Sequence, residues 1–226
     1  MKKSNIIIMA FSVFILASIL VLFIFGKKHN DEEKINHISW DTQLSPFNVI
    51  VTEKGADVHI DYSDTARIGV EYLDKKKNLK LFSVKGDTLF VKGGLRTFVK
   101  CPKLNALICK GSFWVGVSTY NSDTLKANIM GGRVNFYTAD NIDEEKGIGK
   151  IVKPVLVLHA SQKSEVDIYK LLTKLEATIS DSSSVNSRLL VENANANLYS
   201  NSTLQLSPSP SQSAVTRDST SIFRIY

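Results

Sequence analysis

Three potential metal ligands alternate along one short segment, as Asp57, His59 and Asp61. Alternate residues of a β-strand point to the same face, so these side chains are expected on one side of a strand. They would lie about 6.5–7 Å apart along it, which is too far for all three to hold one ion without further ligands. The pattern therefore predicts an outward polar face that could contact a partner, and neither a metal nor a cofactor.

Two aromatic residues, Phe113 and Trp114, are adjacent in the sequence. Neighbouring residues of a strand point to opposite faces, so only one of the two rings can enter a core. Exposed aromatic side chains often contact partner molecules. Trp114 is therefore a further candidate for surface binding, alongside the alternative that the pair packs against a nearby loop.

Other chemical patterns are weaker. The segment Lys92–Arg96 could hold an anion on its backbone amides, but no helix or Walker pattern follows it, which favours a turn. Asp167, Glu176 and Asp181 could meet on adjacent coils, as catalytic acids do in β-helical polysaccharide-cleaving enzymes. A chain with 22 acidic residues offers such pairings by chance. Without a nucleophile elbow or a triad pattern, we expect no enzyme and assign no catalytic residue.

Charge and cysteine content exclude further classes. The formal net charge of +6 is spread over 28 basic and 22 acidic residues, which lacks the dense basic footprint of a nucleic-acid-binding protein. Cys101 and Cys109 show no zinc spacing, and in one extended segment they would lie about 26 Å apart. The two cysteines can form a disulfide or remain as two buried thiols. We expect that folding does not depend on a disulfide between them.

The N-terminus predicts a membrane anchor over residues 1–26. An uncharged run between Lys3 and Lys27 contains about 21 mostly apolar residues (5–25), enough to cross a hydrocarbon core of roughly 30 Å. The run is longer than the apolar region of a cleavable signal peptide. It ends in lysines, and no small-residue cleavage site follows it. We therefore expect an uncleaved, single-pass anchor in a bacterial membrane. Residues 27–37 form a charged linker to a domain on the periplasmic side.

Alternating apolar residues predict strands throughout the region 38–103. Two such runs in Phe47–Tyr62 flank the turn sequence Glu53–Ala56, which predicts a β-hairpin. Two more runs, ending at Val84 and beginning at Thr88, flank a Gly-Asp turn. An amphipathic helix is not expected in this region.

A repeat follows in the region 104–226, with a protruding loop at 140–154. Each repeat has an alternating strand, a small or polar bend and a second short strand. Val115 and Val134 are 19 residues apart, and so are Val166 and Val185. This period predicts an all-β fold of the β-solenoid, or β-helix-like, type; an antiparallel sandwich is the alternative. The four valines are expected inside, whereas three polar neighbours are expected to form outward columns: Asn135, Asp167 and Asn186.

Several segments resemble one known family. They are EKGADVHID from Glu53, GDTLFV from Gly86, KCPKLNALICKGSFWVGV from Lys100, and the L-x-A-x-I-S-x-S-S-x-V pattern of Leu175–Val185. These are similar to the DUF2807 family, the "putative autotransporter adhesin head GIN domain", over residues 38–226. The resemblance implies a β-helical cell-envelope protein of Bacteroidetes-type bacteria, without established catalytic residues.

Together these patterns predict a membrane-anchored, non-enzymatic module of the cell envelope with a binding, adhesion or scaffolding role. The expected partners are the membrane, through residues 5–25, and an envelope polysaccharide or protein, with no nucleic acid. Two alternatives are a polysaccharide-active enzyme on the same β-helix and an envelope-sensing ectodomain.

Overall fold

The computed structural model describes residues 13–21, 37–41, 44–72, 81–118, 122–137 and 154–226. Residues 13–21 form a short helix with exposed apolar side chains. Within the described ranges, no helix is both long and apolar enough to cross a membrane. Most of the predicted anchor and linker, at 1–12 and 22–36, and the predicted loop, at 140–153, lie outside the described residues.

The rest of the described chain is all-β and forms a separate compact unit. Its first strands are β1 (His37–Asp41), β2 (Val49–Thr52), β3 (Asp57–Tyr62), β4 (Arg67–Tyr72), β5 (Phe82–Lys85), β6 (Thr88–Val91), β7 (Arg96–Cys101), β8 (Ala106–Val117) and β9 (Thr124–Tyr137). The later strands are β10 (Val155–Ser161), β11 (Glu165–Tyr169), β12 (Leu172–Ile179), β13 (Ser184–Ser187), β14 (Val191–Leu198), β15 (Thr203–Leu206), β16 (Gln212–Arg217) and β17 (Ile222–Ile225).

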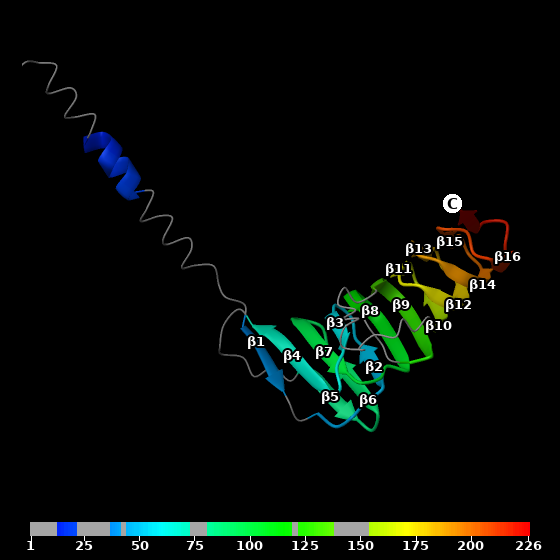
Figure 1. Cartoon of the computed structure of the whole chain (residues 1–226), viewed down its shortest axis with the longest axis horizontal. Helices are drawn as coiled ribbons and strands as arrows, with labels where there is room; N and C mark the ends of the chain where they lie inside the picture. Colours follow the sequence, from blue (N-terminus) through cyan, green and yellow to red (C-terminus); the bar gives the residue numbers. More distant parts are fainter. Residues whose placement is uncertain (1–12, 22–36, 42–43, 73–80, 119–121, 138–153) are drawn as a thin grey trace, which may run out of the picture. The chain divides into compact units, whose positions relative to one another are not determined.

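The strands form two layers that the long strands β8 and β9 join (Figure 1). In the first layer the neighbours run β5, β6, β2, β8, β9, β10, β12, β14 and β16. In the second layer they run β1, β4, β7, β3, β8, β9, β11, β13, β15 and β17. Each half of β8 and β9 belongs to one layer, so a single strand turns the corner between them. All pairings from β2 and β3 through β17 are parallel, apart from those of β4 and β5.

The predicted equivalent, inward positions of the four valines are confirmed by the strand register and by their burial. Val115 pairs with Val134, Val134 with Val166, and Val166 with Val185, and all four side chains are completely buried. The column continues to Leu204, which is also buried. Each coil therefore contributes one residue to an inward column, and its neighbours in the stack cover it.

The hairpin predicted around Glu53–Ala56 was wrong. Strands β2 and β3, on either side of Glu53–Ala56, pair with β6 and β7 on one side and with β8 on the other, all in parallel. The turn therefore joins the two layers. The prediction failed because a corner between layers and a hairpin turn use the same small and polar residues. Strands β5 and β6 do form a hairpin, because they pair antiparallel around the predicted turn at Gly86 and Asp87.

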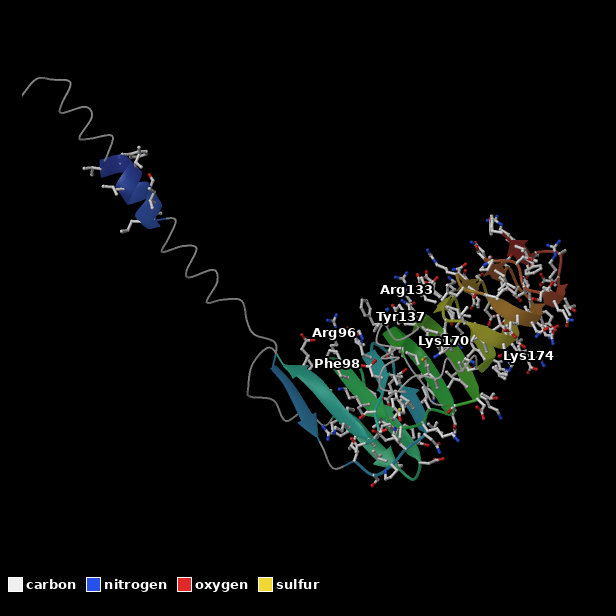
Figure 2. All side chains as sticks on the ribbon, in the orientation of Figure 1. Arg96, Phe98, Arg133, Tyr137, Lys170 and Lys174 are labelled. Carbon is white, nitrogen blue, oxygen red and sulfur yellow. The ribbon has the colours of Figure 1, made fainter. Side chains whose placement is uncertain are left out.

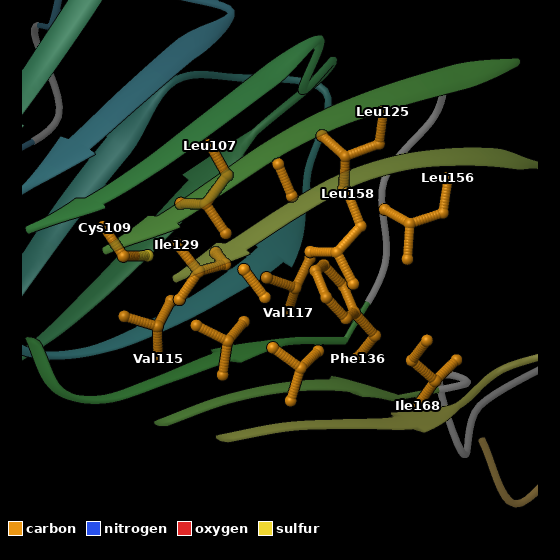
Figure 3. Close-up of a cluster of buried hydrophobic side chains, with 14 of the residues drawn as sticks. Leu107, Cys109, Val115, Val117, Leu125, Ile129, Phe136, Leu156, Leu158 and Ile168 are labelled. Carbon is orange, nitrogen blue, oxygen red and sulfur yellow. The ribbon is translucent and has the colours of Figure 1, made fainter. Parts of the chain in front are cut away.

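The core lies between the layers (Figure 3). Leu107, Leu125 and Leu156 enter it from the first layer, and Phe136 and Ile168 enter it from the second. All five are at most 1% exposed. Burial of this apolar column provides the main stabilisation, since each coil alone would leave its inner face in water.

The corner contains a second column that the sequence analysis missed. Ser164, Ser183, Ser202 and Ser221 follow one another at 19-residue intervals, and each is buried. The backbone N–H of Ser164 donates to Oγ of Ser183 at 3.1 Å, and the hydroxyls of Ser202 and Ser221 lie 3.4 Å apart. The serines thus satisfy polar groups where the chain leaves the regular ladder. The repeated spacing was visible in the sequence.

Strand β16 has one charged residue in register with a buried column. Ile179 pairs with Leu198, and Leu198 pairs with Arg217. Arg217 donates from Nη1 to the carbonyl of Ser221 at 2.8 Å. A charged residue on an edge strand discourages pairing with another sheet edge.

Both cysteines are buried free thiols. Burial raises the pKa of the Cys101 and Cys109 thiols to about 12. Cys109 also lies beside Thr52 and Ser112, whose hydroxyl oxygens are 2.5 Å apart in the corner. Unreactive, buried thiols of this kind act as small apolar core residues.

Replacing Val166 with alanine should lower the free energy of unfolding by about 1–3 kcal/mol, because the change removes buried methyl groups and leaves a small cavity. The outward neighbour Asn186 provides the control, and Asn186→Ala should change it by no more than about 0.5 kcal/mol. Urea unfolding of the two variants measures both values. Equal losses would contradict the inward position of Val166.

Candidate functional site

A β-bulge places two aromatic side chains on the outside of the second layer. The backbone N–H groups of Phe113 and Trp114 both donate to the carbonyl of Ala56, at 2.9 and 3.1 Å. The register of β8 against β9 shifts at this point, so two residues on β8 occupy the space of one. Phe113 is 74% exposed and Trp114 is partly exposed. The expectation that one of them enters the core was wrong, because a bulge suspends the strict alternation of a strand.

The Trp114 indole lies across a glycine on its own strand. A Cβ atom on Gly116 would lie 2.1 Å from Cη2 of Trp114 and 2.8 Å from Cζ2 and Cζ3, so only glycine leaves room for the ring. The Asn135 amide satisfies its neighbours when its oxygen accepts from Nε1 of Trp114 at 3.3 Å and from the Tyr137 hydroxyl at 2.7 Å. The indole is thus held flat on the sheet by a glycine beneath and a hydrogen bond at its edge.

Trp114 belongs to a continuous row of rings, which we term the aromatic strip: Phe98, His59, Trp114, Tyr137 and Tyr169. These residues come from five neighbouring strands of the second layer, in the order β7, β3, β8, β9 and β11. Consecutive ring centroids lie 5.1, 4.4, 6.4 and 5.6 Å apart. Arg188 extends the strip, with its guanidinium carbon 5.3 Å from the centre of the Tyr169 ring.

The rings of the strip differ in which surface they present. Phe98 and His59 are stacked at an interplanar angle of 18°, and Tyr137 and Tyr169 at 12°, so these pairs cover one another's faces. Trp114 is tilted by 50° from His59 and by 38° from Tyr137. One face of its six-membered ring covers Gly116, so its exposed surface is the opposite face. Trp114 is therefore a flat apolar floor between two stacked pairs (Figure 2 labels Phe98 and Tyr137, one from each pair).

The predicted triplet lies on this outer face, as its alternation indicated. Asp57 accepts a hydrogen bond from Nε of Arg96 at 3.2 Å, and its Oδ1 is buried without a partner in the described part of the chain. His59 lies within the aromatic strip, and Asp61 accepts from the hydroxyl of Ser118. The three side chains have three different environments. Among the described residues there is no group of three metal-ligating side chains.

The pKa of His59 is lowered from 6.5, chiefly because burial penalises the charged imidazolium. Asp57, Asp61 and Glu71 oppose this effect, whereas Arg96 adds to it. Between the lowered pKa of folded His59 and pH 6.5, His59 is protonated in the unfolded chain but neutral in the folded one. The contribution of neutral His59 to the stability of the folded state is therefore complete above about pH 6.5. It is lost as the pH falls through the pKa of His59 in the folded state.

We therefore expect wild-type stability to fall more steeply than that of His59→Phe between about pH 7 and pH 5. Phenylalanine keeps a ring next to Phe98 but does not titrate. Urea unfolding of both proteins across this range measures the difference. A wild-type protein that gained stability relative to His59→Phe on acidification would contradict the assignment.

Two arginines on the outer face near Trp114 are each paired with a carboxylate. Arg96 contacts Asp57 and also Glu71, the latter at 3.8 Å. On the other side, Arg133 donates from Nε to Glu165 at 2.8 Å and also contacts it through Nη2. Figure 2 shows Arg96 and Arg133 on the same side of the stack as Phe98 and Tyr137, with Lys174 toward the other side. The surroundings of the indole thus offer balanced charge.

The predicted outward column is confirmed next to the strip. Asn135 pairs with Asp167 and Asp167 with Asn186 in the strand register, and none of them is fully buried. Nδ2 of Asn186 donates to Asp167 at 3.4 Å. The register continues to Gln205 on β15. Amide and carboxylate groups are thereby repeated from coil to coil along the outer face.

Other candidates are not brought together. The Lys92–Arg96 segment forms the turn between β6 and β7. Asp167 lies on β11 in the second layer, whereas Glu176 lies on β12 in the first layer and pairs with Lys174 at 2.5 Å. Asp181 lies in an exposed corner with a positive φ of 54°. The suggested group of catalytic acids is therefore not assembled.

Most of the aromatic strip was missed from sequence. Tyr137 and Tyr169 are 32 residues apart, which is the same offset as Val134 and Val166. Extending the valine register by three residues would have paired the two tyrosines. The contacts of Phe98 with His59 depend on β7 joining the stack beside β3, which no sequence spacing indicated.

Comparisons with known proteins show a shared fold. No protein-family model and no curated protein matches the sequence. A crystal structure of a "putative adhesin" from Bacteroides fragilis NCTC 9343 is similar, with a TM-score of 0.56 and 13% identity, over 86% of this chain and 98% of that chain. A "putative lipid binding protein" from Parabacteroides distasonis ATCC 8503 has a TM-score of 0.50 and 13% identity, over 84% of this chain and 96% of that chain.

Proposed function

We propose that the chain is a non-enzymatic binding module of the bacterial cell envelope, whose target contacts the aromatic strip at Trp114. The observation that carries this proposal is the flat, partly exposed indole over Gly116, next to the 74% exposed ring of Phe113. Apolar rings gathered on a surface, rather than in a core, mark sites of interaction. A rigid sheet beneath them lowers the entropy lost on binding.

The fold supports the same role. We propose that the two-layer stack is a β-solenoid related to the DUF2807 family, since coils repeat every 19 residues in parallel register. The similar structures include a "putative adhesin", which fits a binding or adhesion role. The separation of Asp167, Glu176 and Asp181 supports a non-enzymatic protein.

We further propose that residues 1–26 anchor the chain in the membrane, with the β-rich unit on the periplasmic side. The uncharged run between Lys3 and Lys27 supports this proposal. Protein extracted from membranes should then have an intact mass that includes Met1 or begins at Lys2. A mature chain that begins after Gly26 would contradict an uncleaved anchor.

Retention on envelope fractions tests the binding role. The full-length chain, Trp114→Ala and the control Tyr199→Ala are applied to immobilised polysaccharide, lipid and protein fractions of a bacterial envelope. Tyr199 is 44% exposed and lies outside the strip. We expect at least one fraction to retain the wild-type chain and Tyr199→Ala, and about tenfold weaker binding by Trp114→Ala. Retention by none of the fractions, or equal retention of all three proteins, would contradict the proposal.

A further inference from the structure

We propose that the ligand of the aromatic strip is a neutral polysaccharide that lies along the stack of coils, with one pyranose ring on Trp114. This inference rests on the proposed binding function and names the chemical class of the target. Three features of the outer face carry it: the flat floor, the balanced charge and the column of planar polar groups.

The floor favours a ligand with a flat, C–H-rich face. The exposed face of Trp114 lies between the His59 pair and the Tyr137 pair, with His59 at 4.4 Å and Tyr137 at 6.4 Å between ring centroids. The axial C–H groups of a pyranose ring form such a face, and they contact the electron-rich surface of an indole. Asn135 fixes the indole before a ligand arrives, so binding requires little reorganisation.

The charges favour a neutral ligand. Arg96 is paired with Asp57, and Arg133 with Glu165, on the two sides of the indole. A strand of nucleic acid or an anionic lipid surface is attracted by cations that lack such partners. Because each of these arginines already has a carboxylate within contact distance, an anionic ligand would have to compete with it.

The polar column supplies hydrogen bonds in the direction of the stack. The Asn135 amide is already bonded to Trp114 and Tyr137. Beyond it, Asp167 and Asn186 occupy successive coils, which are spaced by about 4.8 Å in a β-sheet. A carboxylate can accept several hydrogen bonds, and Asp167 accepts one from Asn186. Planar amides and carboxylates can bond pairs of neighbouring hydroxyl groups. A chain of sugars along the stack therefore meets the indole first and then one polar group per coil.

The experiment is a titration of the full-length chain carrying Trp40→Phe, which leaves Trp114 as its only tryptophan. The probes are dextran, galactomannan and xylan as neutral polysaccharides, alginate as an acidic one, and vesicles of phosphatidylglycerol. Tryptophan emission reports contact at Trp114, and calorimetry measures affinity at low and high salt. Intact probe length after incubation reports any cleavage.

We expect at least one neutral polysaccharide to change the emission and to bind with an affinity that varies less than about twofold with salt. Trp114→Ala should weaken its binding at least tenfold, and Trp114→Phe, which keeps a flat ring, should weaken it less. Asp167→Ala should weaken binding severalfold without changing the emission of the free protein. Thr178→Ala, on the outer side of the first layer, should leave binding unchanged.

Each other outcome overturns the inference in a distinguishable way. Trp114-dependent binding of alginate or vesicles alone, lost at high salt, would contradict the neutral polysaccharide but keep the binding function. The neutral polysaccharide would also be contradicted, and the binding function kept, by a second result. In it, none of the three neutral probes binds, while the envelope protein or lipid fraction retains the chain through Trp114. Failure to bind these probes and every envelope fraction would overturn the proposed function as well. Shortening of a polysaccharide would contradict a non-enzymatic role.

Discussion

Gly116→Leu is expected to abolish binding at the aromatic strip while leaving the protein folded. A Cβ at Gly116 would lie 2.1 Å from Cη2 of Trp114, so the leucine side chain must displace the indole from the sheet. We expect at least a tenfold loss of affinity for whichever envelope fraction the wild-type protein binds. The free energy of unfolding should fall by no more than about 2 kcal/mol, because the lost ring contacts are partly offset by the strand preference of leucine.

Thr178→Leu provides the matched control, since Thr178 lies on the outer side of β12 in the first layer, outside the aromatic strip and the polar column. In a Trp40→Phe background, the emission of Trp114 should shift to longer wavelength in Gly116→Leu as the indole enters water. Thr178→Leu should leave both the emission and the binding unchanged. Unchanged binding by Gly116→Leu would show that the flat position of the indole is not needed.

Gly132→Val should produce the largest loss of stability. Gly132 has a φ of 95°, and a Cβ there would lie 2.0 Å from the carbonyl oxygen of Ser112 in the neighbouring coil. Backbone strain of this kind costs about 1–3 kcal/mol for a residue with a side chain. The clash also pushes two coils apart at their corner, so we expect a total loss above about 3 kcal/mol in urea unfolding.

Gly86→Ala measures the cost of backbone strain without the steric clash that Gly132→Val adds. Gly86 also has a positive φ, of 61°, but a Cβ there would meet no atom within 4 Å. We expect this change to cost about 1 kcal/mol, from backbone strain alone. Similar losses in Gly86→Ala and Gly132→Val would contradict the close approach of β8 and β9 at the corner.

The regular coils could be predicted from the sequence because their signal is periodic. Val166 and Val185 repeat with the coil, so their burial and the outward position of Asp167 and Asn186 followed from one spacing. The serine column at Ser164 and Ser183 repeats in the same way and was available to the same reasoning.

The candidate site could be predicted only in part because it lies where the period breaks. Trp114 was identified as an adjacent aromatic, but the bulge that turns both it and Phe113 outward depends on the Ala56 carbonyl, which lies far away in sequence. Phe98 approaches His59 because β6 and β7 join the stack on one side of β2 and β3 while β8 joins on the other. Such an order of coils is set by packing between distant segments, and local alternation contains no trace of it.

Site-specific photocrosslinking in cells tests most directly that the outer face at Trp114 is where this protein meets its target. Phe113→p-benzoylphenylalanine extends a ring that is already 74% exposed and leaves Trp114 in place. Tyr199→p-benzoylphenylalanine serves as the control, at a ring that is 44% exposed on a distant coil. Our account predicts a light-dependent adduct from position 113, which Trp114→Ala suppresses, and none from position 199. Adducts at position 199 alone, or at position 113 regardless of Trp114, would contradict it.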